Sequence, residues 1–179
     1  MLSKLSIKDV DLKDKVVFIR VDFNVPMDKQ GKIINTARIE AAMPTLKYAL
    51  EKGATKLVLC SHLGRPKGKG FEAEFTLKPV AAALEKIMGE KVLFLNDCVG
   101  DEIEKQVKAA TEKLVLLENV RFHAEEEAKD ENAPNVKEFR AKLRKLADIY
   151  VDDAFGTAHR AHSSMVGEGY DIRCAGLLL

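Results

Sequence analysis

The sequence predicts an α/β domain in which helices on both faces cover a doubly wound, mostly parallel sheet, a Rossmann-like three-layer α/β/α architecture. Five short apolar runs are continuous rather than alternating, as expected for strands that are covered on both faces. Segments with apolar residues at helical spacing lie between these runs, so strands and helices alternate. No internal repeat or low-complexity linker divides the 179 residues, so we expect a single domain over residues 1–179.

The expected strands cover residues 16–21, 57–59, 92–95, 114–117 and 149–151. Residues 171–179 end in Ala-Gly-Leu-Leu-Leu, which is typical of a strand that is interrupted within a longer protein. The alternative is a natural C-terminal strand that is buried at the edge of the sheet.

Two helices are expected between the first three strands. Residues 39–50 carry apolar side chains three or four positions apart, and the pattern stops before Gly53. Residues 80–88 repeat this pattern and stop before Gly89. Both segments therefore predict amphipathic helices that end at a glycine.

Two further helices are expected from signals at their N-termini. Asp101 is a candidate N-cap for a third helix, with Ile103 and Val107 facing inward. Asn135 with Glu138 three residues later resembles a capping box at the start of a fourth helix.

The composition excludes several classes of protein. Hydrophobic residues make up 46% and charged residues 32% of the chain, and no apolar run approaches the roughly 20 residues that span a bilayer. The N-terminus has no secretory signal, so we expect a cytoplasmic protein without a membrane partner. A net charge of +1 does not favour nucleic acid as a partner. The three cysteines show no metal-ligand spacing, so we expect reduced thiols and no metal site.

Polar loops with Arg or His follow the expected strands. In open α/β sheets, ligands bind beyond the carboxyl ends of the strands, which is where these loops begin. The loop at 152–164 carries one Arg and two His, and we interpret it as a binding loop rather than a core element because its charges would lack partners inside. The cations that can converge at this edge are Arg38, His62, Arg65, Arg121 and Arg160.

Such a set of cations indicates a small anion as the ligand. A guanidinium group binds carboxylate or phosphate with two parallel hydrogen bonds, and several cations in one cleft repel each other unless an anion joins them. Asp22 and Asn24 would then orient a neutral part of the ligand, such as a hydroxyl group. A single Arg after a strand is usually a solvated loop residue, and residues 125–127, all Glu, are interpreted as a solvated face. The recurrence of cations at one topological position is what indicates a site.

Other catalytic patterns are weak. Asp152, His162 and Ser163 include the residue types of a hydrolytic triad, but nothing resembles a nucleophile elbow. The chain contains neither G-x-x-x-x-G-K-[ST] nor G-x-G-x-x-G, so it shows no nucleotide site of those kinds.

Four motifs follow one another along the chain. They are Arg20-Val-Asp-Phe-Asn-Val-Pro26, Ser61-His-Leu-Gly-Arg-Pro66, Leu117-Glu-Asn-Val-Arg-Phe-His123 and Asp153-Ala-Phe-Gly-Thr-Ala-His-Arg-Ala-His-Ser-Ser164. Their order and spacing resemble phosphoglycerate kinase over nearly the whole chain. That family has two domains, and the chain resembles only the N-terminal, substrate-binding one, so the nucleotide-binding C-terminal domain is expected to be absent.

The resemblance implies half of an enzyme that transfers a phosphoryl group between 1,3-bisphosphoglycerate and ADP in glycolysis, with 3-phosphoglycerate or 1,3-bisphosphoglycerate bound on this chain. Asp22 and Asn24 would contact the hydroxy acid, and Arg38 would be the catalytic residue that stabilises the transferring phosphoryl group. The nontransferring phosphate would be held by His62, Arg65, Arg121 and Arg160. The same site would be lined by Phe23, Ser61, Gly64 and His159.

The resemblance also implies Mg²⁺ and ATP or ADP, bound by the absent domain, so no cofactor is expected on this chain and the chain alone is expected to be catalytically incompetent. The full-length enzyme is expected to be a monomer. Two residues depart from the family pattern, since Asp152 stands where many members have Asn and Ala37 where some have Gln. The competing interpretation is a stand-alone, noncatalytic anion-binding or interaction module.

Overall fold

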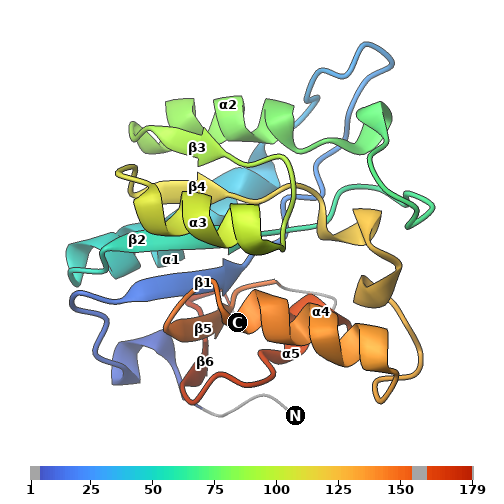
Figure 1. Cartoon of the computed structure of the whole chain (residues 1–179). Coiled ribbons are helices and arrows are strands. Elements are labelled where there is room, and N and C mark those ends of the chain that lie inside the picture. The colour runs from blue at the N-terminus through green and yellow to red at the C-terminus, as the bar shows by residue number, and fades with distance from the viewer. Residues whose placement is uncertain (1–4, 155–160, 179) are drawn as a thin grey trace.

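The computed structural model describes residues 5–154 and 161–178. In this part of the chain, six parallel strands form one sheet in the order β3-β4-β2-β1-β5-β6. The strands are β1 (Val16–Arg20), β2 (Lys56–Cys60), β3 (Val92–Phe94), β4 (Leu114–Leu116), β5 (Ile149–Asp152) and β6 (Arg173–Ala175). The arrowheads of β1, β3 and β4 point to one side, where the loops after β1, β2 and β4 gather (Figure 1). The predicted doubly wound α/β architecture is confirmed.

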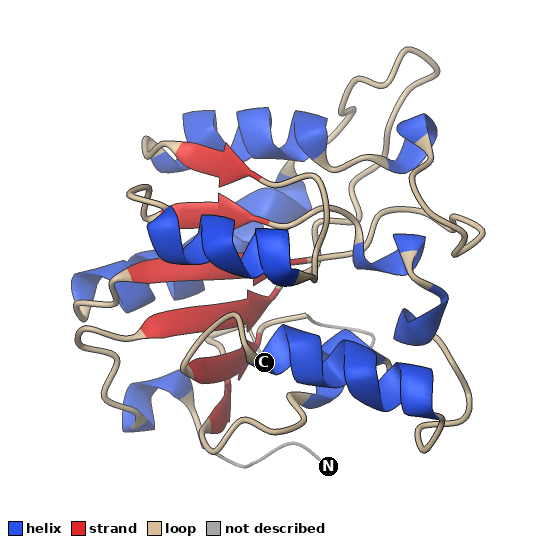
Figure 2. Cartoon of the chain, viewed as in Figure 1, coloured by secondary structure: helices blue, strands red, loops and turns tan. Residues whose placement is uncertain are grey.

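The helices cover the sheet from two sides (Figure 2). They are α1 (Ala37–Glu51), α2 (Lys78–Met88), α3 (Asp101–Ala109), α4 (Pro134–Arg144) and the short α5 (Ser163–Val166). Four 3-10 turns are described in addition, η1 (Ile7–Asp9), η2 (Ala73–Phe75), η3 (Val120–Phe122) and η4 (Ala124–Glu126). Among the described residues, no helix has the length and apolar character needed to cross a membrane.

Two apolar clusters, one on each face of the sheet, explain why the strands are continuous apolar runs in the sequence. Val17 and Ile19 of β1 pack in the cluster that contains Leu46 of α1. Phe18, the residue between them, packs in the other cluster with Phe139 of α4. Successive side chains of a strand point to opposite faces, so a strand that is covered twice needs apolar residues at every position.

Three predicted details are wrong. The last strand is β6 (Arg173–Ala175), and it ends before the terminal leucines. The N-cap of α3 is Gly100, with Asp101 already inside the first turn. The helix α4 begins at Pro134 after Ala133, without a side-chain cap, so the capping box expected at Asn135 is not formed. Proline fits the first turn because the amide hydrogen that it lacks would have no helical acceptor there.

The carboxyl end of β5 is buried, against the expectation that this segment stays outside the core. Asp152 and Asp153 have no exposed surface. The amide of Ala154 donates to Oδ1 of Asp152 at 2.9 Å, and the Thr45 hydroxyl and the Leu178 amide donate to Oδ1 of Asp153 at 2.9 and 3.0 Å. These bonds supply the partners that the sequence does not reveal. Burial nevertheless dominates and raises the pKa of both carboxyl groups to about 6.

Two helix-ending glycines provide a matched test of this packing. Gly89 caps α2 at φ +67° and Gly167 caps α5 at φ +63°. An added Cβ at Gly89 meets nothing within 4 Å, whereas at Gly167 it would lie 2.7 Å from the Tyr150 ring. We predict that Gly89→Ala costs about 1–2 kcal/mol from backbone strain alone, and that Gly167→Ala costs about 1–3 kcal/mol more from overpacking. Urea unfolding measures both, and equal losses would contradict the tight packing of α5 on Tyr150.

The buried Asp152 carboxyl group predicts a specific pH dependence. Its pKa is raised in the folded state, so folding favours the neutral form, and the stability that this gives below pH 4 is lost as the pH rises through about 6. Asn stays neutral and keeps the oxygen that accepts from Ala154. We therefore predict that Asp152→Asn raises the free energy of unfolding at pH 7.5 and that this gain shrinks toward pH 4.5.

Denaturant unfolding at the two pH values measures this effect. Asp171→Asn, at an exposed position, is the control and should show no comparable gain. A gain from Asp152→Asn that is the same at both pH values would contradict the raised pKa.

Candidate functional site

The site lies at the carboxyl edge of the sheet, where separate strands deliver cationic side chains. Arg20 ends β1, His62 follows β2, Arg121 lies in η3 after β4, and Arg38 lies in the first turn of α1. The register of β1 places Arg20 beside Cys60 of β2 and Asp152 of β5, so these loops start side by side. The strand order brings residues that are far apart in the sequence to one place.

His62 is held in one tautomer by Arg20. The Nη2 of Arg20 lies 3.1 Å from Nδ1 of His62, and because a guanidinium group only donates, Nδ1 must accept. The hydrogen of the neutral ring is therefore on Nε2. Burial lowers the pKa of His62 to about 2, and the nearby charges of Arg20, Arg121 and Arg38 act in the same direction. His62 is thus a neutral hydrogen-bond donor in a strongly positive field.

Arg20 is itself fully buried and forms an ion pair with Glu126. Its Nη2 lies 3.9 Å from Oε2 of Glu126, and its Nε donates to the Ser164 hydroxyl at 2.7 Å. The hydroxyl and the amide of Ser164 donate in turn to the two Glu126 oxygens, at 2.6 and 2.8 Å. The Tyr150 hydroxyl closes the network by donating to the Ser164 carbonyl at 2.6 Å. The network joins β1, β5, η4 and α5.

Glu126 corrects the prediction of a solvated face over residues 125–127. Its neighbours Glu125 and Glu127 keep contact with solvent, but Glu126 has no exposed surface. Burial raises the pKa of the Glu126 carboxyl group, while Arg20 and Ser164 oppose the shift. Neither Arg20 nor Glu126 received a role from the sequence. Arg20 had a signal, a charge at the end of an apolar strand, whereas nothing distinguishes Glu126 from its neighbours.

Arg121 and Arg65 form the part of the site that faces outward. The Nη1 of Arg121 donates to the Gly64 carbonyl at 3.2 Å, its Nε lies 3.6 Å from Oε1 of Glu127, and its side chain is 12% exposed. Burial is the main cause that lowers the pKa of Arg121, and the charge of Arg65 contributes. Within the described part of the chain, Arg65 is exposed and has neither a hydrogen-bond partner nor an ion-pair partner.

Asp22, Asn24 and Arg38 form a second group in the loop after β1. The Nη1 of Arg38 lies 3.2 and 3.1 Å from the two Asp22 carboxylate oxygens and donates to the Asn24 carbonyl at 3.1 Å. The Arg38 side chain remains 53% exposed. The Asn24 amide oxygen accepts from the Gly64 amide at 2.8 Å. Asn24 therefore joins the loop after β1 to the loop after β2.

Two predicted site residues lie inside the protein. Phe23 and Ser61 have no exposed surface. The Ser61 hydroxyl accepts from the Phe23 amide at 2.9 Å and donates to the His62 carbonyl at 2.9 Å. In this structure both residues fix the loops from within, and neither presents a surface to a ligand.

His159, Arg160 and Gly64 are the other residues predicted to line the site. His159 and Arg160 lie outside the described residues. Gly64, at φ +62°, contributes main-chain contacts, and an added Cβ would meet the Phe75 ring at 2.5 Å. A groove of about 660 Å³ lies beside the cationic group, with Asn24 and Gly64 among its lining residues.

Cys60, Cys98 and Cys174 form no disulfide and are buried. Cys60, beside the loop after β2, is buried, and burial raises the pKa of its thiol to about 12. A thiol in this state is a poor nucleophile because the thiolate is the reactive form.

The arrangement can bind a multiply charged anion and can orient one neutral group. Three side chains, Arg38, Arg65 and Arg121, reach solvent around the neutral His62. The two outer carboxylates of the site, Asp22 and Glu127, already face Arg38 and Arg121. A polar ligand here meets guanidinium groups from three separate crossovers.

Comparison with known proteins gives a consistent result. The family model described as phosphoglycerate kinase matches residues 7–179. Phosphoglycerate kinase 2 of Rhizopus niveus is 58% identical over 186 residues, which is 99% of this chain and 44% of that protein. The phosphoglycerate kinase of Aplysia californica is 53% identical over 188 residues, which is 99% of this chain and 45% of that protein.

Comparison with solved structures points to the same family. The solved structure of phosphoglycerate kinase from Coxiella burnetii matches at a TM-score of 0.81 and 41% identity, over 98% of this chain and 42% of that one. This chain therefore spans less than half the length of these relatives. Since the family model covers almost all of its residues, the chain belongs to the phosphoglycerate kinase family.

Proposed function

We propose that this chain binds 3-phosphoglycerate or 1,3-bisphosphoglycerate at the carboxyl edge of its sheet. The observation that carries this proposal is the surrounding of His62: a buried, neutral imidazole whose Nδ1 is occupied by Arg20, within the field of two further arginines. Such a field opposes any cation and favours an anion. Because Nδ1 is occupied, the Nε2–H group of His62 is the one that can donate a hydrogen bond to a ligand.

Each residue near His62 has a distinct role in this proposal. Arg65 and Arg121 hold the phosphate that is not transferred, together with the His62 donor. Asp22 and Asn24 orient the hydroxyl and carboxyl end of the acid, where a carboxylate on the protein accepts a hydroxyl hydrogen. Arg38 reaches the phosphoryl group that is transferred and stabilises its charge, and we retain Arg160 from the family resemblance as a further phosphate ligand.

As part of a phosphoglycerate kinase, the chain would serve phosphoryl transfer between 1,3-bisphosphoglycerate and ADP in glycolysis, in the cytoplasm. Phosphoryl transfer depends on positioning and on stabilising the charge of the transferring group. The cationic side chains at the carboxyl edge of the sheet, here called the cationic edge, would position the acid substrate. We propose that the nucleotide and Mg²⁺ are held by the part of the family that this chain does not span, and that this chain alone binds the acid without turnover.

The proposal predicts anion-specific stabilisation of the folded chain. A ligand that binds only the folded state stabilises it by about 2.7 kcal/mol at a hundredfold excess over Kd. We expect 3-phosphoglycerate to raise the melting temperature above the value in chloride at equal ionic strength. Arg65→Ala with Arg121→Ala should remove this difference, and isothermal titration should show at least tenfold weaker binding of the acid.

The matched control is Arg173→Ala, an exposed arginine on β6 at the edge of the sheet, which should respond as the parent does. An equal response of the double variant and the parent would place the anion site elsewhere. ATP formation by the pure chain in a coupled assay would instead overturn the statement that it binds without turnover.

A further inference from the structure

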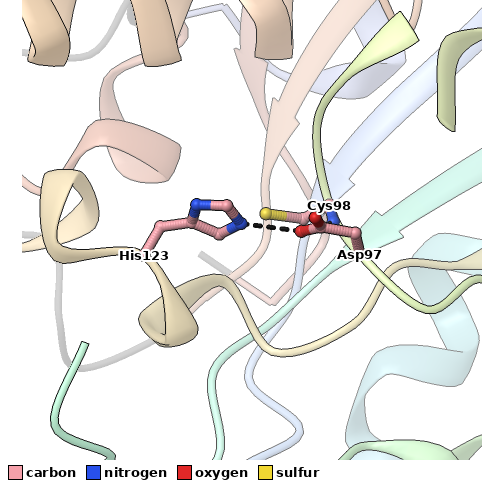
Figure 3. A group of neighbouring side chains, drawn as sticks. All are labelled: Asp97, Cys98 and His123. Atoms are coloured by element: carbon pink, nitrogen blue, oxygen red, sulfur yellow. Dashed lines mark hydrogen bonds and ion pairs between the residues drawn. The ribbon is translucent and has the colours of Figure 1, made fainter. Parts of the chain in front are cut away.

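Three side chains outside the anion site bring sulfur, nitrogen and oxygen atoms together. Asp97 and Cys98 lie in the loop between β3 and α3, and His123 follows η3. The ligand atoms that these side chains offer all lie within 4.8 Å of one another. Figure 3 shows the imidazole and the carboxylate facing each other, with the Cys98 sulfur beside the line that joins them. The sequence does not predict this group because its members come from two separate loops.

The group has one buried side and one side that solvent can reach. Nε2 of His123 lies 2.7 Å from Oδ1 of Asp97. The Asp97 side chain is 47% exposed and the His123 side chain 28% exposed, whereas Cys98 has no exposed surface. A cation would therefore approach from solvent at Asp97 and His123, with the Cys98 sulfur as its buried ligand. Water would be the further ligand on the exposed side.

Supporting contacts hold the Asp97 and His123 side chains in place, and Cys98 packs in the apolar cluster that contains Phe139. The Cys98 amide donates to Oδ1 of Asp97 at 2.7 Å, which orients the carboxylate. The His123 ring packs against Phe139 of α4 with ring centroids 5.2 Å apart. Partners behind the ligands hold metal sites in shape and set their affinity. The alternative is an Asp–His ion pair beside a cysteine that only packs in the apolar cluster around Phe139, and it predicts no thiolate absorption with Co²⁺.

The chemistry of the three atoms selects the kind of ion. Zn²⁺ and similar borderline cations bind thiolate, imidazole and carboxylate together, at about 2.0–2.3 Å from each atom. Hard cations such as Mg²⁺ prefer oxygen ligands alone. Binding requires that the hydrogen between His123 and Asp97 leaves Nε2 of His123: an imidazolium ring releases it as a proton, whereas a neutral ring moves it to Nδ1. The Cys98 thiol releases its hydrogen as a proton. The charge of the cation offsets the burial that otherwise keeps the thiol neutral.

We propose that Asp97, Cys98 and His123 form a binding site for a divalent cation of the Zn²⁺ class, with water completing the coordination. The site is separate from the anion site in its ligands, so it stands whether or not the chain binds a phosphorylated acid. It does adjoin that site through η3, since His123 lies two residues beyond Arg121.

Cobalt is the probe for this site because a thiolate bound to Co²⁺ absorbs in the near ultraviolet. We expect Co²⁺ to give this absorption with the reduced chain, Zn²⁺ to abolish it by competition, and a large excess of Mg²⁺ to leave it unchanged. Cys98→Ser should remove the absorption, and His123→Gln, on the exposed side, should weaken Co²⁺ binding at least tenfold. Cys174→Ser, in β6, is the control and should bind as the parent does.

A second readout covers the case in which Cys98→Ser fails to fold. Zn²⁺ should raise the melting temperature of the parent and of Cys174→Ser but not that of His123→Gln. No thiolate absorption in the parent would overturn the proposal. Binding that survives unchanged in both Cys98→Ser and His123→Gln would overturn it as well.

Discussion

The ion pair of Arg20 with Glu126 is the constraint on which the cationic edge of this protein depends. Both side chains are buried, at 1% and 0% exposure, and a buried charge without a partner is strongly unfavourable. Ser164 supports both ions, because its hydroxyl accepts from Arg20 while its hydroxyl and amide donate to Glu126. Removing one partner of such a pair typically costs about 3–5 kcal/mol, because the other charge is then left buried alone.

The buried pair fixes the inner part of the site, which lies between the outer cations. Arg20 reaches His62 and thereby sets which imidazole nitrogen carries the hydrogen. Glu126 reaches Ser164 and so anchors α5, which begins at Ser163, three residues after Arg160 in the sequence. Fixed donors around a ligand site cost little reorganisation when the ligand binds. Arg65 and Arg38, by contrast, remain exposed, where they can adjust to a ligand.

The sequence predicted the layers of the fold and the gathering of Arg38, His62, Arg65 and Arg121 at one edge of the sheet, whereas Arg160 lies outside the described residues. Continuous apolar runs such as residues 16–21 predict strands covered on both faces, and parallel strands bring the ends of β1, β2 and β4 to one edge. The caps predicted at Asp101 and Asn135 are wrong. Gly100 precedes α3 and Pro134 is the first residue of α4, and neither helix has a side-chain cap. Sequence signals of this kind show which residues can cap a helix, but they do not decide at which of several neighbouring residues the helix begins.

The buried polar network could not be predicted, and the reason is physical. Glu126 has the same chemistry as Glu125 and Glu127, and only the position of η4 over Arg20 and Ser164 turns it inward. Asp152 and Asp153 are likewise buried because Ala154, Thr45 and Leu178 meet them in the fold. The partners of Asp153, Thr45 and Leu178, are distant from it in the sequence, so the sequence does not show that they will meet it.

A comparison of Glu126→Gln with Glu125→Gln tests most directly whether the buried pair organises the site. Gln keeps the shape of Glu126 but leaves the Arg20 charge unpaired. With the fold verified by circular dichroism, we expect binding of 3-phosphoglycerate by Glu126→Gln to weaken at least tenfold, while Glu125→Gln binds as the parent does. Binding by Glu126→Gln that equals the parent's would show that the cationic edge does not depend on the buried pair.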